Sequence, residues 1–177
     1  MKKALGILAA VWGAMGAIGL LGFALWRLTP IAIETFQYDL SILHWFSLIA
    51  YVIFMAWSEG YKGFQQGYSP RVAARCLYLS QNPSPLLVLF APVFTLGYFH
   101  ATRRRLITSY VVTFVIIGLV VIIKLLDQPW RGIIDAGVVV GLAWGLVSFF
   151  YFFAVAFFTD DFPYSPEVKS SASHHRH

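Results

Sequence analysis

Two histidines lie beside apolar stretches of the sequence and could ligate a metal ion. His44 begins one such stretch and His100 ends another. Two histidines on different helices can bind the iron of one b-type haem, while arginines pair with its propionates. A single histidine at a membrane boundary is more often only a polar side chain. A haem is therefore an alternative hypothesis, and the leading expectation is that the chain has no cofactor or metal site.

Four charged residues surround the start of the last apolar stretch and could form a proton or ion relay. Asp135 follows Arg131 by one helical turn, so the two can pair on one helix face. Asp127 can cap the helix, and Lys124 precedes it closely. An ionisable residue inside a membrane span is costly and often functional. Since no acidic residue lies deep in any predicted span, the favoured interpretation is an ion pair that closes the helix end.

Basic residues in the middle of the chain could bind lipid phosphate groups. Three of them directly precede an apolar stretch, which is typical of an orientation signal and of an anionic-lipid site. Two others belong to an amphipathic pattern that begins at Ser69-Pro70, an N-cap followed by proline. We expect this helix to lie in the membrane plane and the glycine-rich residues 59–68 before it to form an interfacial loop. The candidate phosphate-binding residues are Lys62, Arg71, Arg75, Arg103, Arg104 and Arg105.

Regularly spaced glycines predict close packing of helices. The last apolar stretch carries three glycines four residues apart, which line one helix face and let another backbone approach. The first apolar stretch carries glycines three residues apart. The seam that they predict would lie either within one chain or between chains. The glycines concerned are Gly137, Gly141, Gly145, Gly13, Gly16 and Gly19.

The composition makes an integral membrane protein the expected class. Of the 177 residues, 59% are hydrophobic and 12% are charged, whereas soluble domains carry about 25% charged residues. The mean hydropathy is +0.71. These values exclude a soluble globular domain and a disordered chain. The net charge of +5 does not indicate nucleic-acid binding, because the basic residues lie beside apolar spans.

We predict an all-α fold, an integral membrane helical bundle with four spans in one domain over residues 1–159. Residues 85–99 are short for a span and are interrupted by Pro92 and Gly97, so they are expected as a re-entrant segment or as a fifth span. The polar residues 160–177 are expected to be a mobile tail. The predicted spans are 4–26, 41–58, 106–126 and 132–158.

The distribution of lysine and arginine favours four spans. With a cytoplasmic N-terminus, four spans place ten basic residues inside, whereas five spans divide the basic residues six to six. The positive-inside bias therefore predicts four spans in a bacterial-type inner (plasma) membrane, with both termini in the cytoplasm.

No sequence motif argues for an enzyme, because the HExxH, GxSxG and CxxC patterns are missing. The leading hypothesis is a non-enzymatic accessory or assembly subunit of a membrane complex. Its expected partners are membrane lipids, especially anionic ones, and other membrane-protein chains or copies of itself, but not nucleic acid. The first alternative is a small transporter or lipid-handling protein that uses a cytoplasmic basic surface. The second is the haem-binding electron carrier.

Overall fold

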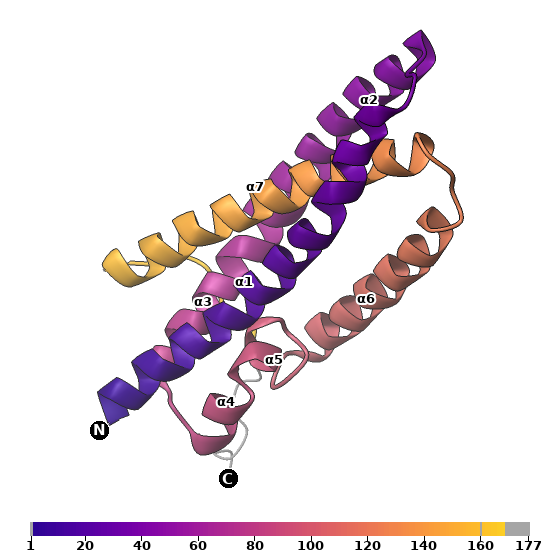
Figure 1. Cartoon of the computed structure of the whole chain (residues 1–177). Helices are drawn as coiled ribbons and strands as arrows, with labels where there is room; N and C mark the ends of the chain where they lie inside the picture. Colours follow the sequence, from indigo (N-terminus) through magenta and orange to yellow (C-terminus); the bar gives the residue numbers. More distant parts are fainter. Residues whose placement is uncertain (1, 160, 169–177) are drawn as a thin grey trace.

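The computed structural model describes residues 2–159 and 161–168, and this part of the chain is built from helices (Figure 1). Four of them are long and apolar enough to cross a membrane: Lys2–Gln37, Ile42–Gln81, Arg103–Ile123 and Trp130–Phe158. The prediction of an all-helical bundle with four such helices is confirmed. In chain order the elements are α1 (Lys2–Glu34), η1 (Thr35–Gln37), α2 (Ile42–Met55), η2 (Ala56–Tyr68), α3 (Ser69–Gln81), α4 (Pro85–Leu89), α5 (Ala91–Thr95), α6 (Arg103–Ile123) and α7 (Trp130–Phe158).

The first helix continues beyond the predicted end of its span at Trp26. Pro30 lies inside α1 and removes only one backbone donor. Beyond it, Ala32 is buried, and the carbonyl oxygen of Ile31 accepts a hydrogen bond of 3.3 Å from Nε2 of Gln128. These contacts with the start of α7 hold the last turns of α1 in place.

The second long helix corrects the prediction of a loop over residues 59–68. Here α2 continues into η2, a π-helix, and then into α3 without a break. Gly60 packs on α7, where an added Cβ atom would lie 2.9 Å from the Trp144 ring. The Trp144 indole nitrogen donates a hydrogen bond of 2.7 Å to Gln65. The glycines and polar residues of this segment therefore serve helix packing rather than a turn.

The helix α3 is not the separate helix that the sequence suggested, and its predicted position in the membrane plane stays a prediction. It continues the line of η2 and runs along α1 and α7 (Figure 1). Val72, Cys76 and Leu79, the predicted apolar face, are buried there. Ser69 does not cap the helix, because its hydroxyl bonds instead to Ser148 of α7 at 2.8 Å.

The ambiguous apolar segment 85–99 forms two short helices, α4 and α5, each of five residues. A helix of this length cannot cross a bilayer, which takes about 20 residues. The two helices lie beside the N-terminal half of α1 (Figure 1). Thr95 fixes α5 to α1 by donating a hydrogen bond of 2.9 Å to the carbonyl oxygen of Gly13.

Small residues of α1 form the centre of the bundle. Ala10, Ala14 and Ala17 follow one helix face and pack with Val72 of α3 and with other buried residues, among them Phe149 of α7. Alanine lets the backbones approach closely without the conformational cost of glycine. The most extensive packing surfaces of α1 are therefore those with α7 and α3.

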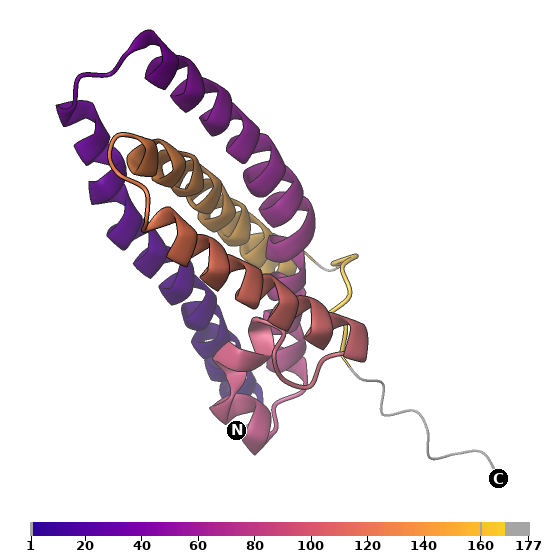
Figure 2. The same ribbon diagram turned by 90° about the vertical axis from the view of Figure 1, so that its right-hand side faces the viewer.

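The helix α6 stands apart from the other long helices (Figures 1 and 2). Its apolar side chains are exposed around the whole circumference, and Ser109 is its one buried residue. The loop after α5 holds the N-terminal half of α6, because Ser109 donates a hydrogen bond of 3.3 Å to the carbonyl oxygen of Gly97 and Tyr98 bonds to Thr113. An exposed surface of this kind is suited to lipid chains or to another membrane helix.

Part of the predicted mobile tail returns to the bundle. The backbone of Glu167 accepts a hydrogen bond of 3.1 Å from the amide of Thr102, and Val168 pairs with Ala101. Residue 160 and residues 169–177 lie outside the described residues, so the prediction for them stays a prediction.

Candidate functional site

Each of the three glycines of α7 packs against a large side chain of the second long helix. An added Cβ atom at Gly137 would lie 2.5 Å from the Tyr51 ring, and one at Gly145 would lie 2.6 Å from the Phe64 ring. Between them, a Cβ atom at Gly141 would lie 2.9 Å from Oε2 of Glu59. The seam therefore lies within the chain, between α7 and the helix formed by α2 and η2.

The glycines of α1 behave less uniformly. Gly13 and Gly16 face α5, where added Cβ atoms would lie 2.6 Å from Thr95 and 2.5 Å from Pro92. Gly19 has no atom within 4 Å of such a Cβ position, so it packs against no other helix in the described part of this chain, and its place in a packing seam stays a prediction for a contact between chains. The three-residue spacing drifts around the helix, which moves Gly19 away from the side that α5 covers.

The charged residues at the start of α7 divide into a pair and two exposed side chains. Nε of Arg131 lies 3.8 Å from Oδ2 of Asp135, and the Asp135 side chain is buried. Lys124 and Asp127 are exposed, and Asp127 does not cap α7, whose N-cap residue is Pro129. The proposed relay through Lys124 therefore has no geometric basis in the structure.

Gln128, which no sequence pattern indicated, joins α1 to α7 at this end of the bundle. Its Oε1 atom accepts hydrogen bonds from the amide of Gly132 at 3.1 Å and from the hydroxyl of Thr35 at 3.2 Å. Its Nε2 atom donates to Ile31 at 3.3 Å. The side chain thus performs the capping role expected of Asp127 and also joins α1 to α7. A glutamine has no sequence signal that distinguishes such a role.

The two candidate haem ligands lie at opposite ends of the bundle. His44 starts α2 and stacks edge-on against Trp130, the first residue of α7, at a centroid distance of 4.8 Å. His100 precedes α6, whose 21 residues lead back toward the α7 end. That helix alone is about 30 Å long at 1.5 Å per residue. One haem cannot bind both histidines, so this pairing was wrong.

The six basic residues are not one surface. Lys62 lies in η2 with its Nζ atom 3.8 Å from the centre of the Trp57 ring. Arg103 and Arg104 are exposed at the start of α6. The remaining three come together with Tyr68 in a group that we call the arginine cluster: Arg71 and Arg75 of α3, Arg105 of α6 and Tyr68 of η2.

Arg75 is the most deeply buried arginine of the arginine cluster. Its side chain is 2% exposed, which contradicts its expected place among the lipid headgroups. One guanidinium nitrogen donates to the carbonyl oxygen of Phe94 at 2.6 Å, and the other donates to that of Glu167 at 3.1 Å. Arg75 therefore ties α3 to α5 and to the returning C-terminal segment. Neither acceptor carries a negative charge, so the hydrogen bonds leave its positive charge uncompensated.

Arg71 and Arg105 are half-buried beside Arg75, and Arg71 and Tyr68 leave hydrogen-bonding capacity unused. Within the described residues, Nε of Arg71 and the hydroxyl of Tyr68 are buried and have no hydrogen-bond partner. Each such group costs about 1–3 kcal/mol when it stays unpaired. Arg105 lies beside Gly97, with its Nε atom 3.0 Å from the position of an added Cβ atom. The cluster thus presents donors that face no acceptor.

The charges of the arginine cluster are unbalanced. Arg71, Arg75 and Arg105 lie close enough to repel one another electrostatically, and Glu167 is the acidic side chain that acts on both Arg75 and Arg105. Guanidinium groups bind phosphate oxygens with two parallel hydrogen bonds, which makes arginine the preferred residue for this ligand. An anion with several acceptor oxygens would satisfy both the donors and the charge.

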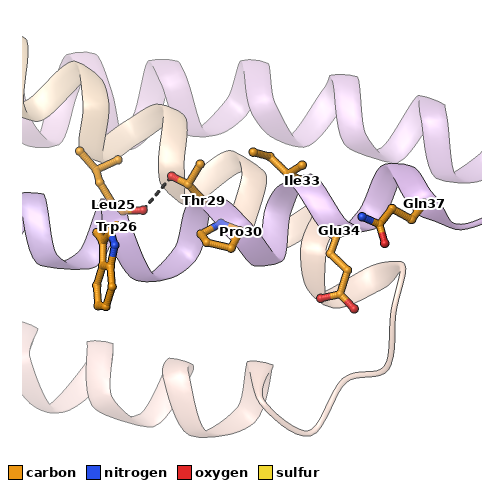
Figure 3. A pocket seen from close by; sticks show the side chains of 7 residues that line it. All are labelled: Leu25, Trp26, Thr29, Pro30, Ile33, Glu34 and Gln37. Carbon is orange, nitrogen blue, oxygen red and sulfur yellow. Dashed lines mark hydrogen bonds between the residues drawn. The ribbon is translucent and has the colours of Figure 1, made fainter.

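A groove follows α1 on the side where α6 runs. It has a volume of about 590 Å³ and is lined mainly by apolar side chains, with Glu34 and Gln37 at its end. Figure 3 shows the lining side chains, Trp26 and Pro30 among them, along this stretch of α1. Together with the exposed surface of α6, the groove offers a lateral apolar surface of the kind that an acyl chain can cover. Comparison with protein-family models, with curated proteins and with solved structures finds no match for the chain.

Proposed function

We propose that this protein is a lipid-handling membrane protein that binds the headgroup of an anionic lipid at the arginine cluster. The observation that carries the proposal is that Nε of Arg71 and the hydroxyl of Tyr68 are buried without a hydrogen-bond partner among the described residues, beside a second positive charge, that of Arg105. A lipid phosphate supplies both the missing acceptors and the missing negative charge.

The position of α6 supports a lipid rather than a small anion. This helix begins at the arginine cluster and then runs apart from the bundle with its apolar side chains exposed. Acyl chains attached to a headgroup at the cluster would lie along α6, toward the groove of α1. The positive-inside bias supports a cytoplasmic position for the cluster in an inner (plasma) membrane, with both termini on that side.

Native mass spectrometry tests the proposal on protein extracted from its own membrane in a mild detergent. The double variant Arg71→Gln, Arg105→Gln should lose bound anionic phospholipid. The matched control Arg103→Gln, Arg104→Gln removes the same charge from exposed positions of the same region and should keep the lipid. Equal lipid retention by the two double variants would show that the cluster is not the binding site.

A second measurement separates a lipid from a free anion. Delipidated protein should gain thermal stability from phosphatidylglycerol, but not from a zwitterionic lipid. Stabilisation by inorganic phosphate to the same extent, without any preference for the anionic lipid, would identify a small-anion site and refute lipid handling.

An assembly subunit is the second candidate, because α6 has the exposed circumference that a neighbouring membrane helix could cover. The same mass spectra distinguish it. A stoichiometric increase of protein mass that persists in the Arg71→Gln, Arg105→Gln variant would favour the assembly role. Lipid-sized adducts on a single chain would favour lipid handling.

A further inference from the structure

Glu59 is a carboxyl group in the middle of the helical bundle, at a place where the sequence predicted a loop. It lies near the centre of the continuous helix Ile42–Gln81, which has 40 residues. Its carboxyl group packs against the backbone of α7 at Gly141, with Oε2 2.9 Å from the position of an added Cβ atom. Any larger residue at position 141 would occupy this space, so the glycine seam makes room for the acid.

A second acidic side chain lies on the same side of the seam. Asp135 of α7 is 4% exposed, and its Oδ2 atom has no hydrogen-bond partner among the described residues. Tyr51 of α2, which packs on Gly137, lies within range of the charges of both Glu59 and Asp135. The seam between α2, η2 and α7 is thus lined by two carboxyl groups and one phenol.

The cations near the seam do not neutralise Glu59. Arg131 of α7 pairs with Asp135 at 3.8 Å. Lys62, on η2 itself, is exposed and lies over the Trp57 ring. Arg71 of α3 belongs to the arginine cluster beyond the other end of η2. In the described part of the chain, Glu59 forms neither an ion pair nor a hydrogen bond with any of them.

A carboxylate without an ion-pair partner among packed membrane helices is costly, and such residues usually serve proton or ion pathways. A metal ion requires several ligands, whereas no three His, Cys, Asp or Glu side chains gather in the described residues. A proton needs only one oxygen. Glu59 is also half-buried rather than sealed, so exchange with the outside is open to it.

From this geometry we infer that Glu59 is a proton-binding site inside the membrane bundle, which takes up and releases a proton at its carboxyl group. The long π-helix η2 presents this residue to α7, and π-helical turns within α-helices are frequent at functional sites. Tyr51 and Asp135 are the neighbouring titratable groups on the same seam. This inference is independent of the lipid proposal, because it concerns a different surface of the same helix.

Labelling with dicyclohexylcarbodiimide tests the inference on the full-length chain in native membranes. This apolar reagent adds a protonated carboxyl group across one of its C=N bonds and leaves a stable adduct on the residue. The adduct should map to Glu59, decrease as the pH is raised and be lost in Glu59→Gln. The matched control Asp127→Asn removes an exposed acid at the end of the bundle and should leave the labelling unchanged.

Infrared difference spectra provide a second readout that does not depend on access of the reagent. A pH-dependent carboxylic C=O band should be present in the wild-type protein and absent in Glu59→Gln. Labelling of Glu59 that does not change with pH would overturn the inference. So would the absence of both the adduct and the band in a protein whose Glu59→Gln variant folds normally.

Discussion

Replacing Gly145 by alanine measures how tightly the second long helix packs on α7. The new Cβ atom would lie 2.6, 2.7 and 2.9 Å from three atoms of the Phe64 ring, whereas ordinary contacts begin at 3.4 Å. The ring must therefore withdraw by up to about 0.8 Å, the difference between 3.4 and 2.6 Å. Tyr68 restricts this movement, because its ring packs edge-on against Phe64 at a centroid distance of 5.4 Å.

The expected cost follows from two opposing effects. Overpacking of this kind costs about 1–3 kcal/mol, and alanine gains about 0.5–1 kcal/mol over glycine within a helix. Gly19→Ala in α1 is the matched control, because its Cβ atom meets nothing within 4 Å and only the gain remains. The gain cancels in the comparison, so Gly145→Ala should be less stable than Gly19→Ala by about 1–3 kcal/mol.

Thermal unfolding in one detergent, followed by tryptophan fluorescence, measures this difference. For a chain of this length a change of 1 kcal/mol shifts the Tm by about 2–4 °C. Adding Phe64→Leu to Gly145→Ala should recover part of the loss, because the smaller side chain vacates the space that the new Cβ atom needs. Equal Tm values for Gly145→Ala and Gly19→Ala would refute the packing that we describe.

Two further substitutions test how the ends of the bundle are joined. Gln128→Leu removes the hydrogen bonds to Thr35, to Gly132 and to the Ile31 carbonyl oxygen. It should lower the free energy of unfolding by about 1–3 kcal/mol, because buried groups lose their partners. An unchanged Tm would contradict this. Arg75→Met removes the hydrogen bond to the Glu167 carbonyl oxygen and should increase amide hydrogen exchange over residues 165–168, whereas unchanged exchange would show that other contacts hold the segment.

The sequence predicted those helices whose surroundings are uniform. α6 is apolar on all sides and is exposed on all sides, so a hydropathy average describes it correctly, and its bounds differ from the predicted 106–126 by only three residues at each end. The seam glycines of α7 were also identified, because a repeat of small residues every four positions has few uses other than close packing. Such signals are local and need no knowledge of the partner.

Other features depended on partners that are distant in the sequence. Arg75 was assigned to the lipid headgroups because arginines are usually solvated, yet its acceptors are the backbone oxygens of Phe94 and Glu167. His44 and His100 were paired because each adjoins an apolar stretch. Their separation depends on α4 and α5 staying at one end of the bundle, and Pro92 and Gly97 alone did not decide that. Contacts of this kind follow from the tertiary structure rather than from residue type.

The second long helix shows why the residues of greatest interest were the hardest to place. A hydropathy average includes every face of a helix, so it ends a predicted span wherever polar residues begin, whether they face water or protein. In η2 the polar residues Glu59 and Gln65 face α7, and the average ended the span at Ser58, one residue before Glu59. If a helix turns a polar face toward the protein interior, the hydropathy average will divide it at the residues of that face, since those residues lower the average most. An abrupt change to glycine, acidic and amide residues directly after an apolar stretch is therefore itself a reason to consider a continuous helix whose polar face packs on another helix.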